Sequence, residues 1–197
     1  MMLDKFRAYL EKSLPITDEQ FELISKDIKV KTFEKNEQIL NQGEICSKTY
    51  FVTEGLLRSY SIDAKGKVHI IQFAPELWWL SERNGFLFNE AADFNIDAVE
   101  VTTALIIPKD YFTDANPILP GLQDLNHTML NNFIRFMQRR INMLLSATAE
   151  ERYLDFIKLY PNLTLRVPQW MIASYLGITP ESLSRVRKDL AHKHFRP

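Results

Sequence analysis

The stretch YLGITPESLSRVRKDLA, residues 175–191, carries the clearest structural pattern in this chain. Gly177 marks a sharp turn, and Thr179 is a good N-cap for a helix that follows it. Pro180 fits the first helical position, where its missing N–H costs nothing, and Glu181 suits the positive end of the helix dipole. The pattern predicts a helix that begins at this point and runs toward the end of the chain.

A second, apolar helix is expected just before this turn, over residues 169–176. Small Ala173 lets two helices approach closely, and Gly177 turns the chain between them. The inward-facing side chains are expected to be those of Ile172, Leu176, Leu183, Val186 and Leu190. These features, in register over about twenty residues, predict a helix-turn-helix.

The polar side of the second helix is the candidate surface for entering a major groove. Arg reads guanine bidentately and a carboxylate accepts from cytosine, so Arg185 and Glu181 are the predicted base readers. Their i,i+4 spacing equally allows a functionless ion pair. Serine and basic side chains suit phosphates, although Arg187 is equally well explained as a solvated surface base. The predicted DNA-contacting residues are Thr179, Pro180, Glu181, Ser182, Ser184, Arg185 and Lys188.

The charge distribution favours the same interpretation. The whole chain of 197 residues has a net charge of −1. Residues 166–197 hold six basic side chains and two acidic ones, a local net charge of +4. A basic end on a nearly neutral protein is typical of a small nucleic-acid-binding module, while a solvated helix face is the alternative.

Composition excludes several other classes of protein. Cys46 is the only cysteine, so no intrachain disulfide or cysteine-rich metal site can form, and the four histidines are scattered. We therefore expect no metal and no cofactor. The N-terminal residues lack the apolar core of a signal peptide, and no later stretch resembles a membrane span. We expect a cytoplasmic protein without a membrane partner.

The fold class expected is α+β. Two short helices open the chain, and from about Val30 short β-like runs separated by turn residues predict an antiparallel sandwich or barrel, a β-roll of the jelly-roll type. A long helix and the helix-turn-helix follow. The expected domains are a β-roll sensor over 1–116, a dimerisation helix over 117–146 and a DNA-binding domain over 147–197.

The long helix has two apolar stripes. The β-roll can cover only one of these stripes. The other is most simply covered by a second copy of the chain, and the alternative is a helix fully buried within one domain. The predicted dimer-interface residues are Leu130, Phe133, Met137 and Ile141.

The order of β-roll, long helix and helix-turn-helix resembles the Crp/Fnr family of bacterial transcription regulators. The segment NQGEICSKTYFVTEGLLRSYSID, residues 41–63, is similar to the signature of cyclic-nucleotide-binding domains, and VPQWMIASYLGITPESLSRVRKDL, residues 167–190, resembles the family's DNA-reading segment. The resemblance implies a homodimer that binds two-fold symmetric double-stranded DNA, with RNA polymerase as a further partner. It also implies that Pro180, Glu181, Ser184 and Arg185 face bases.

Two departures from the family pattern alter these expectations. Family members that bind cyclic nucleotide hold the phosphate with an Arg-Ser/Thr pair, where this chain has Ala92-Asp93. We therefore expect no cyclic nucleotide and leave the effector unknown. The family's β-hairpin wing has no room after Leu190, so we expect fewer flanking backbone contacts. The residues considered for an effector pocket are Glu76, Trp78, Trp79 and Arg83, although such aromatic residues more often belong to the core.

Two other functions remain open alternatives. One is a small-molecule-binding β-roll with a vestigial helix-turn-helix. The other is a metal-dependent enzyme on a β-roll, which needs several histidines in the barrel, where only His69 lies. No catalytic triad, carboxylate pair or phosphate loop stands out, so we predict a non-enzyme.

Overall fold

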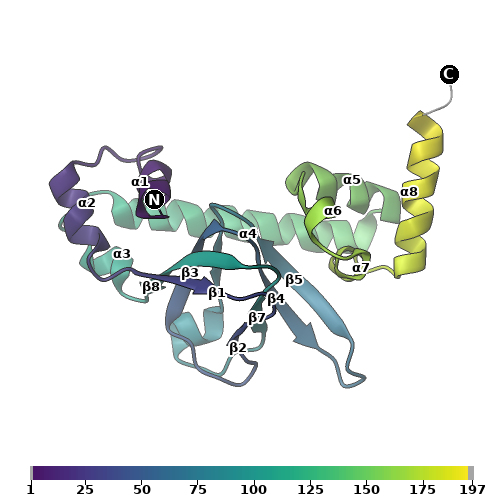
Figure 1. Ribbon diagram of the computed structural model, residues 1–197, viewed down its shortest axis with the longest axis horizontal. Coiled ribbons are helices and arrows are strands. Elements are labelled where there is room, and N and C mark those ends of the chain that lie inside the picture. Colours follow the sequence, from purple (N-terminus) through teal and green to yellow (C-terminus); the bar gives the residue numbers. More distant parts are fainter. Residues whose placement is uncertain (1, 195–197) are drawn as a thin grey trace. The chain divides into compact units, whose positions relative to one another are not determined.

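The structure, a computed structural model, describes residues 2–194 and has α+β architecture (Figure 1). The helices are α1 (Met2–Leu10), α2 (Asp18–Ser25), α3 (Tyr111–Asp114), α4 (Leu122–Ser146), α5 (Ala149–Leu159), α6 (Leu163–Arg166), α7 (Gln169–Leu176), α8 (Pro180–His194) and a short π-helix, η1 (Asn84–Phe88). The strands are β1 (Lys29–Phe33), β2 (Gln38–Leu40), β3 (Lys48–Glu54), β4 (Leu57–Ile62), β5 (Val68–Ala74), β6 (Trp79–Ser81), β7 (Asn95–Ala98) and β8 (Thr102–Pro108). The predicted fold class is confirmed.

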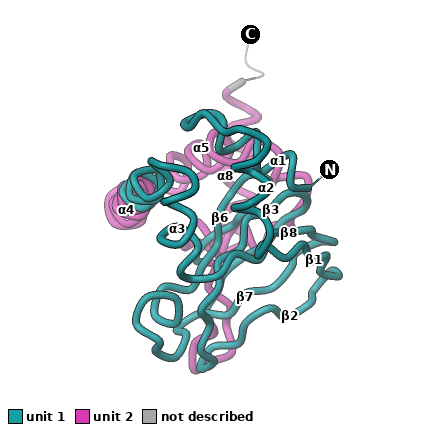
Figure 2. Tube along the Cα trace, turned by 90° about the vertical axis from the view of Figure 1, so that its left-hand side faces the viewer, with its two compact units in different colours: residues 1–61, 71–131 teal, residues 62–70, 132–197 magenta. Residues whose placement is uncertain are grey.

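The chain forms two compact units, which we call the β-roll unit and the helical unit (Figure 2). The β-roll unit consists of residues 1–61 and 71–131, and the helical unit of residues 62–70 and 132–197. The tip of the β4–β5 hairpin therefore belongs to the helical unit although its strands belong to a sheet of the roll.

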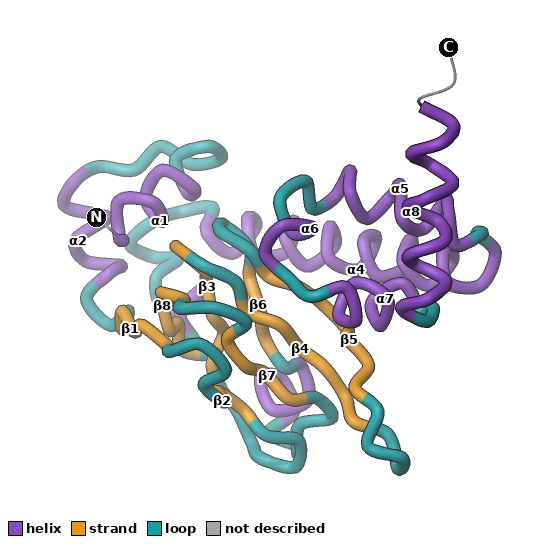
Figure 3. The backbone as a smooth tube through the Cα atoms, turned by 45° about the vertical axis from the view of Figure 1, so that its right-hand side comes forward, coloured by secondary structure: helices purple, strands orange, loops and turns teal. Residues whose placement is uncertain are grey.

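Two four-stranded sheets build the β-roll, in the orders β1-β8-β3-β6 and β2-β7-β4-β5 (Figure 3). Alternate residues of strand β3 contribute to two different layers of the core. Tyr50 and Val52 point into the interior between the sheets, and Phe51 between them points to the opposite face. The period-two alternation thus gives this sheet two buried faces.

The N-terminal helices cover the outer face of the sheet that contains β3. Phe6 and Leu10 of α1 are fully buried against Phe51, and Tyr111 of α3 joins the same cluster. The Thr17–Gln20 capping box expected before α2 is present, with Thr17 accepting from the Gln20 amide at 3.2 Å. Both short helices predicted from the sequence are confirmed.

Two features of the roll differ from the sequence pattern. The β-like sequence over residues 95–108 is divided by bends into β7 and β8, which lie in different sheets. Strand β6 was not predicted, because three residues that begin with Trp79, directly after Trp78, are too few to show an alternation. It pairs with β3, Thr49 opposite Ser81, and is the edge strand of this sheet.

Helix α4 is one continuous helix of 25 residues. Its first half packs in the β-roll unit, where Leu122 is fully buried and Leu125 and Met129 contact the cluster of α1 and α3. Its second half belongs to the helical unit. There, Ile134 and Ile141 are each 53% exposed. This exposed apolar side has no cover among the described residues.

Candidate nucleic-acid interface

The turn between α7 and α8 depends on a residue that adopts a left-handed conformation. Gly177 has φ 66° and ψ 31°, and its amide donates to the carbonyls of Ala173 and Ser174. The Ile178 amide donates to the Ala173 carbonyl at 3.0 Å. A Cβ at Gly177 would lie 3.2 Å from Leu144 Cδ2, so only glycine fits without a shift.

Arg152 of helix α5 stabilises this turn through hydrogen bonds. The Arg152 guanidinium donates to the Ala147 carbonyl and to the Leu176 carbonyl, both at 3.0 Å. Arg152 thus joins the loop that follows α4 to the last turn of α7 and satisfies a carbonyl that the helix end leaves open. Sequence analysis missed this role, since one arginine in a surface helix carries no specific pattern.

Helix α8 begins as the sequence predicts. The Thr179 hydroxyl accepts from the Ser182 amide at 3.2 Å, and the Leu183 amide donates to the Thr179 carbonyl at 3.0 Å. Leu183 is fully buried, while Val186 and Leu190 are half-buried on the same side. These contacts fix the rotation of α8 about its axis, and with it the direction of the polar side.

Four side chains on the other side of α8 are exposed and spaced three, four and seven residues apart, which places them on one face. They are Glu181, Ser184, Arg185 and Lys188. Among the described residues no ion pair joins Glu181 to Arg185, so the functionless pairing considered from the sequence does not occur. The Glu181 backbone amide and the Thr179 hydroxyl hold the pKa of the Glu181 carboxyl below its usual range.

The remaining predicted DNA-contacting residues lie at the start of α8. Thr179 and Pro180 are exposed, and Ser182 is half-buried with its hydroxyl 3.2 Å from that of Thr179. Arg187 is also exposed, but it does not lie on the face that holds Arg185. Arg196, counted in the basic tail, lies outside the described residues.

The tip of the β4–β5 hairpin is bonded to α7, the first helix of the helix-turn-helix. The Ser174 hydroxyl donates to the Val68 carbonyl at 2.8 Å and accepts from the Ile70 amide at 3.0 Å. Arg140 of α4 donates to the Ile70 carbonyl at 2.9 Å. Sequence analysis did not find this attachment, because residues 68 and 174 are joined only by the tertiary fold.

The predicted dimer-interface residues lie on α4 in both units. Ile141 is exposed, and Leu130, Phe133 and Met137 are half-buried. Ile134, between them, is as exposed as Ile141. The spacing Leu130, Ile134, Met137, Ile141 alternates four and three residues, as in the seam of a coiled coil.

The four residues considered for an effector pocket have different surroundings in the β-roll unit. Trp79 lies in the cluster around α1 and α3, with its ring 5.0 Å from that of Phe51, whereas Trp78 packs against the interior of the roll. Glu76 accepts from the Gly55 amide at 3.0 Å. Arg83 lies over the Phe86 ring at 6.0 Å, and burial lowers its pKa.

The structure identifies a buried carboxylate that sequence analysis missed. Glu82 is 3% exposed and accepts from the amides of Gly85 at 2.9 Å and Asp93 at 3.5 Å. The carboxylate beside the Ala92-Asp93 segment is therefore that of Glu82, while Glu76 lies at the Gly55 turn. Asp93 is exposed and accepts from the Asn84 amide group at 2.8 Å.

The described residues contain neither a membrane-spanning helix nor a metal-binding cluster. No helix there is both long enough and apolar enough to cross a membrane. Within residues 2–194 no group of three or more His, Cys, Asp or Glu side chains is placed to hold a metal ion.

Comparisons with known proteins agree with this architecture. Residues 30–115 match the cyclic nucleotide-binding domain family. The chain is 27% identical over 165 residues to the transcriptional activator protein FnrA of Stutzerimonas stutzeri, covering 77% of this chain and 66% of that protein. It is 26% identical over 192 residues to an anaerobic regulatory protein of Aggregatibacter actinomycetemcomitans, covering 88% and 72%. The chain thus spans about two thirds of the length of these relatives.

Solved structures show the same fold. FixK2 from Bradyrhizobium japonicum superposes with a TM-score of 0.72 at 21% identity, covering 85% of this chain and 86% of that one. A transcriptional regulator of the CRP/FNR family from Thermus thermophilus gives a TM-score of 0.64 at 16% identity, covering 86% and 89%. The relatives are regulators, which confirms the prediction of a non-enzyme. The chain is thus similar in sequence to regulators of the FNR type and similar in fold to regulators of the CRP/FNR family.

Proposed function

We propose that this protein is a transcription regulator that binds a two-fold symmetric DNA operator as a homodimer. The exposed polar face of α8 is the observation that carries the proposal. Arg185 and Lys188 project there with no carboxylate partner among the described residues, and buried Leu183 holds the helix behind them. Arg185 and Glu181 read bases, and Ser182, Ser184 and Lys188 hold phosphates.

The homodimer forms through α4. Ile134 and Ile141 expose more than half of their surface to water, and covering them with the same helix of a second copy removes that apolar area from solvent. Leu130 and Met137 belong to the same seam, and Phe133 flanks it. A parallel pair of α4 helices also presents two α8 helices related by a two-fold axis, as an operator with two half-sites requires.

The β-roll, residues 1–116, acts as a sensor that does not take a cyclic nucleotide. Ala92 is buried and apolar, and Asp93 beside it carries a negative charge that repels a phosphate. Residues 117–146 dimerise and residues 147–197 read DNA. The protein works where the DNA is, in the cytoplasm, with RNA polymerase as the partner that converts DNA binding into regulation.

Selection from a random double-stranded DNA pool tests the DNA-binding proposal. We expect enrichment of an inverted repeat whose half-sites lie about one helical turn apart, because two recognition helices enter successive major grooves on one face. Recovery of no sequence above background, with binding to all DNA alike or to none, would support the vestigial helix-turn-helix instead.

Substituting charged residues into the seam of α4 tests the proposed dimer. The double variant Ile134→Glu, Ile141→Glu should sediment as a monomer, while the wild type sediments at twice the chain mass of 23.1 kDa. The control is Thr128→Glu, Asn131→Glu, which adds the same charge to exposed positions of α4 outside the seam. A wild type that is monomeric at micromolar concentration, or a dimer that survives the seam variant, contradicts the α4 interface.

A further inference from the structure

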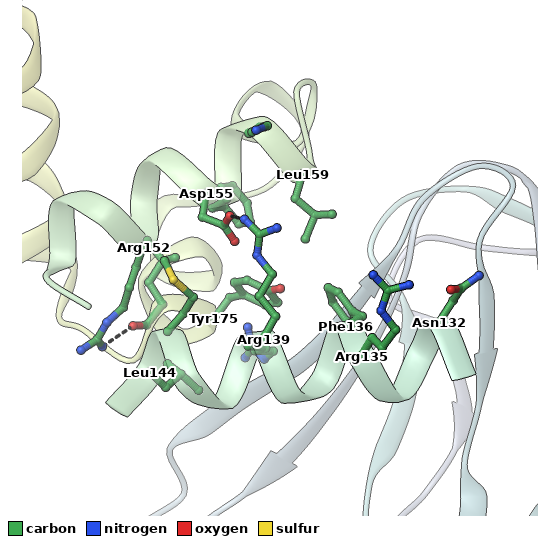
Figure 4. A pocket seen from close by; sticks show the side chains of 14 residues that line it. Asn132, Arg135, Phe136, Arg139, Leu144, Arg152, Asp155, Leu159 and Tyr175 are labelled. Carbon is green, nitrogen blue, oxygen red and sulfur yellow. Dashed lines mark hydrogen bonds and ion pairs between the residues drawn. The ribbon is translucent and has the colours of Figure 1, made fainter. Parts of the chain in front are cut away.

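A cleft of about 580 Å³ lies within the helical unit, between α4, α5 and α7 (Figure 4). Its volume falls in the range of small-molecule sites, about 300 to 1,000 Å³. The side of α4 that lines it carries Phe136, Arg139 and Met143 and is opposite to the exposed seam of Ile134 and Ile141. The cleft is therefore separate from the proposed dimer interface and from the polar face of α8.

The charge of the cleft is strongly positive. It is lined by five basic side chains and one carboxylate, a net charge of +4. These residues are Arg135, Arg139, Arg140, Arg152, Lys158 and Asp155. A concave surface with charge of one sign and low-dielectric walls focuses the field and attracts a counter-charge.

Within the described residues only one of these bases has a carboxylate partner. Arg139 rises from α4 and pairs with Asp155 on α5, and Arg135 points to the same side (Figure 4). Arg152 donates to carbonyl oxygens, and Arg140 donates to a carbonyl and lies 3.5 Å from the centre of the Tyr175 ring. Four positive charges thus have no counter-charge in the part of the chain that the structure describes.

The floor of the cleft is apolar and partly aromatic. Half-buried Phe136 and Met143 come from α4 and half-buried Leu159 from α5, while the rings of Phe156 on α5 and Tyr175 on α7 are buried. Flat rings bury large area at low entropic cost against such side chains, and they stack on arginine planes. The cleft thus combines a surface for a planar ring with donors for several anionic oxygens.

We infer that this cleft binds a nucleoside polyphosphate. A single carboxylate would neutralise one of the four uncompensated charges, whereas a polyphosphate chain carries several. The guanidinium fork matches phosphate oxygens bidentately, and the base of a nucleotide supplies the planar ring. Arg135 and Lys158, both exposed, bind the phosphates, and the half-buried side chains of Phe136, Met143 and Leu159 take the base.

Calorimetric titration of the full chain without DNA tests this inference independently of the proposed DNA binding. ATP, inorganic tripolyphosphate and adenosine serve as probes. We expect ATP to bind at least tenfold more tightly than tripolyphosphate, which lacks the ring, and adenosine not to bind at millimolar concentration. No binding of ATP at millimolar concentration, or equal binding of ATP and tripolyphosphate, overturns the inference.

Three variants locate the site. Arg135→Gln with Lys158→Gln should weaken ATP binding at least tenfold, and Asp155→Asn should strengthen it because the one carboxylate that lines the cleft is removed. The control Lys12→Gln with Lys35→Gln removes two exposed charges from the β-roll unit and should leave affinity unchanged. Circular dichroism checks that each variant is folded. Equal ATP affinity in the control and the cleft variant overturns the location.

A DNA backbone is the rival occupant of so basic a surface. The Arg135→Gln, Lys158→Gln variant should bind DNA as the wild type does when ATP is absent. A fall in DNA affinity as large as that of Lys188→Ala would assign the cleft to DNA and overturn the nucleotide.

Discussion

The β-roll unit and the helical unit differ in the burial and the pairing of the basic side chains compared here. In the roll, Arg58 lies over the Tyr60 ring and pairs with Asp97 through two bonds of 2.6 and 2.7 Å, with side chains 11% and 8% exposed. In the helical unit, Arg185 and Lys188 are exposed and have no carboxylate partner among residues 2–194. A buried pair holds the fold together, whereas an exposed unpaired base is available to an anion from outside.

The physical reason is the cost of desolvation. A charge buried without its partner costs several kcal/mol, so the roll must supply both members of the pair. A charge on an exposed helix face keeps its water and costs little, and it releases counterions when it meets a phosphate. The difference therefore separates residues that stabilise the protein from residues that act on a partner.

The largest expected effect on stability follows from breaking the buried pair. Asp97→Ala should lower the free energy of unfolding by about 3–5 kcal/mol, because Arg58 would lose its counter-charge inside the roll. Urea unfolding measures this loss. The control is Glu11→Ala, which breaks a more exposed pair with Arg7 and should cost under about 1 kcal/mol. Similar losses in the two variants would remove the contrast.

A smaller effect is expected for the exposed pair that joins α8 to α5. Lys193 Nζ lies 2.7 Å from Glu150 Oε1, and their side chains are 62% and 34% exposed. Glu150→Ala should cost about 0.2–1 kcal/mol in low salt and less in 1 M salt, because solvent and ions screen the attraction. A loss of about 2 kcal/mol that persists in high salt would show that this pair fastens α8 as firmly as a buried contact.

The sequence predicts the helical elements because each carries a local signal. Gly177, Thr179 and Pro180 mark the turn and the helix start, and the stripes of α4 repeat every three to four residues. The exposed face of α8 follows from the same periodicity. The places of the residues considered for an effector pocket could not be predicted in this way, because Trp78 and Trp79 are neighbours in sequence yet pack in different clusters.

Features that depend on tertiary contacts leave weaker signals. Glu82 looks like a surface residue until the chain folds back to bring the Asp93 amide to it. The hydrogen bonds between Ser174 and the β4–β5 hairpin connect it to Ile70 and Val68, which lie 104 and 106 positions earlier in the sequence. The sequence indicates one wall of the cleft, because Arg135 and Arg139 lie one helical turn apart on α4. It does not indicate the other wall, which comes from α5 and α7.

The most direct test of the account compares Arg185→Ala with Lys188→Ala in DNA binding. Arg185→Ala should cost about 1–3 kcal/mol at the selected operator and relax base preference at one position per half-site, because a bidentate base contact is lost. Lys188→Ala should weaken operator and random DNA alike and lower the salt slope by about one unit per half-site, because only a phosphate contact is lost. If Arg185→Ala lowers affinity for all DNA evenly and leaves base preference unchanged, the face of α8 grips DNA without reading it, which contradicts the account.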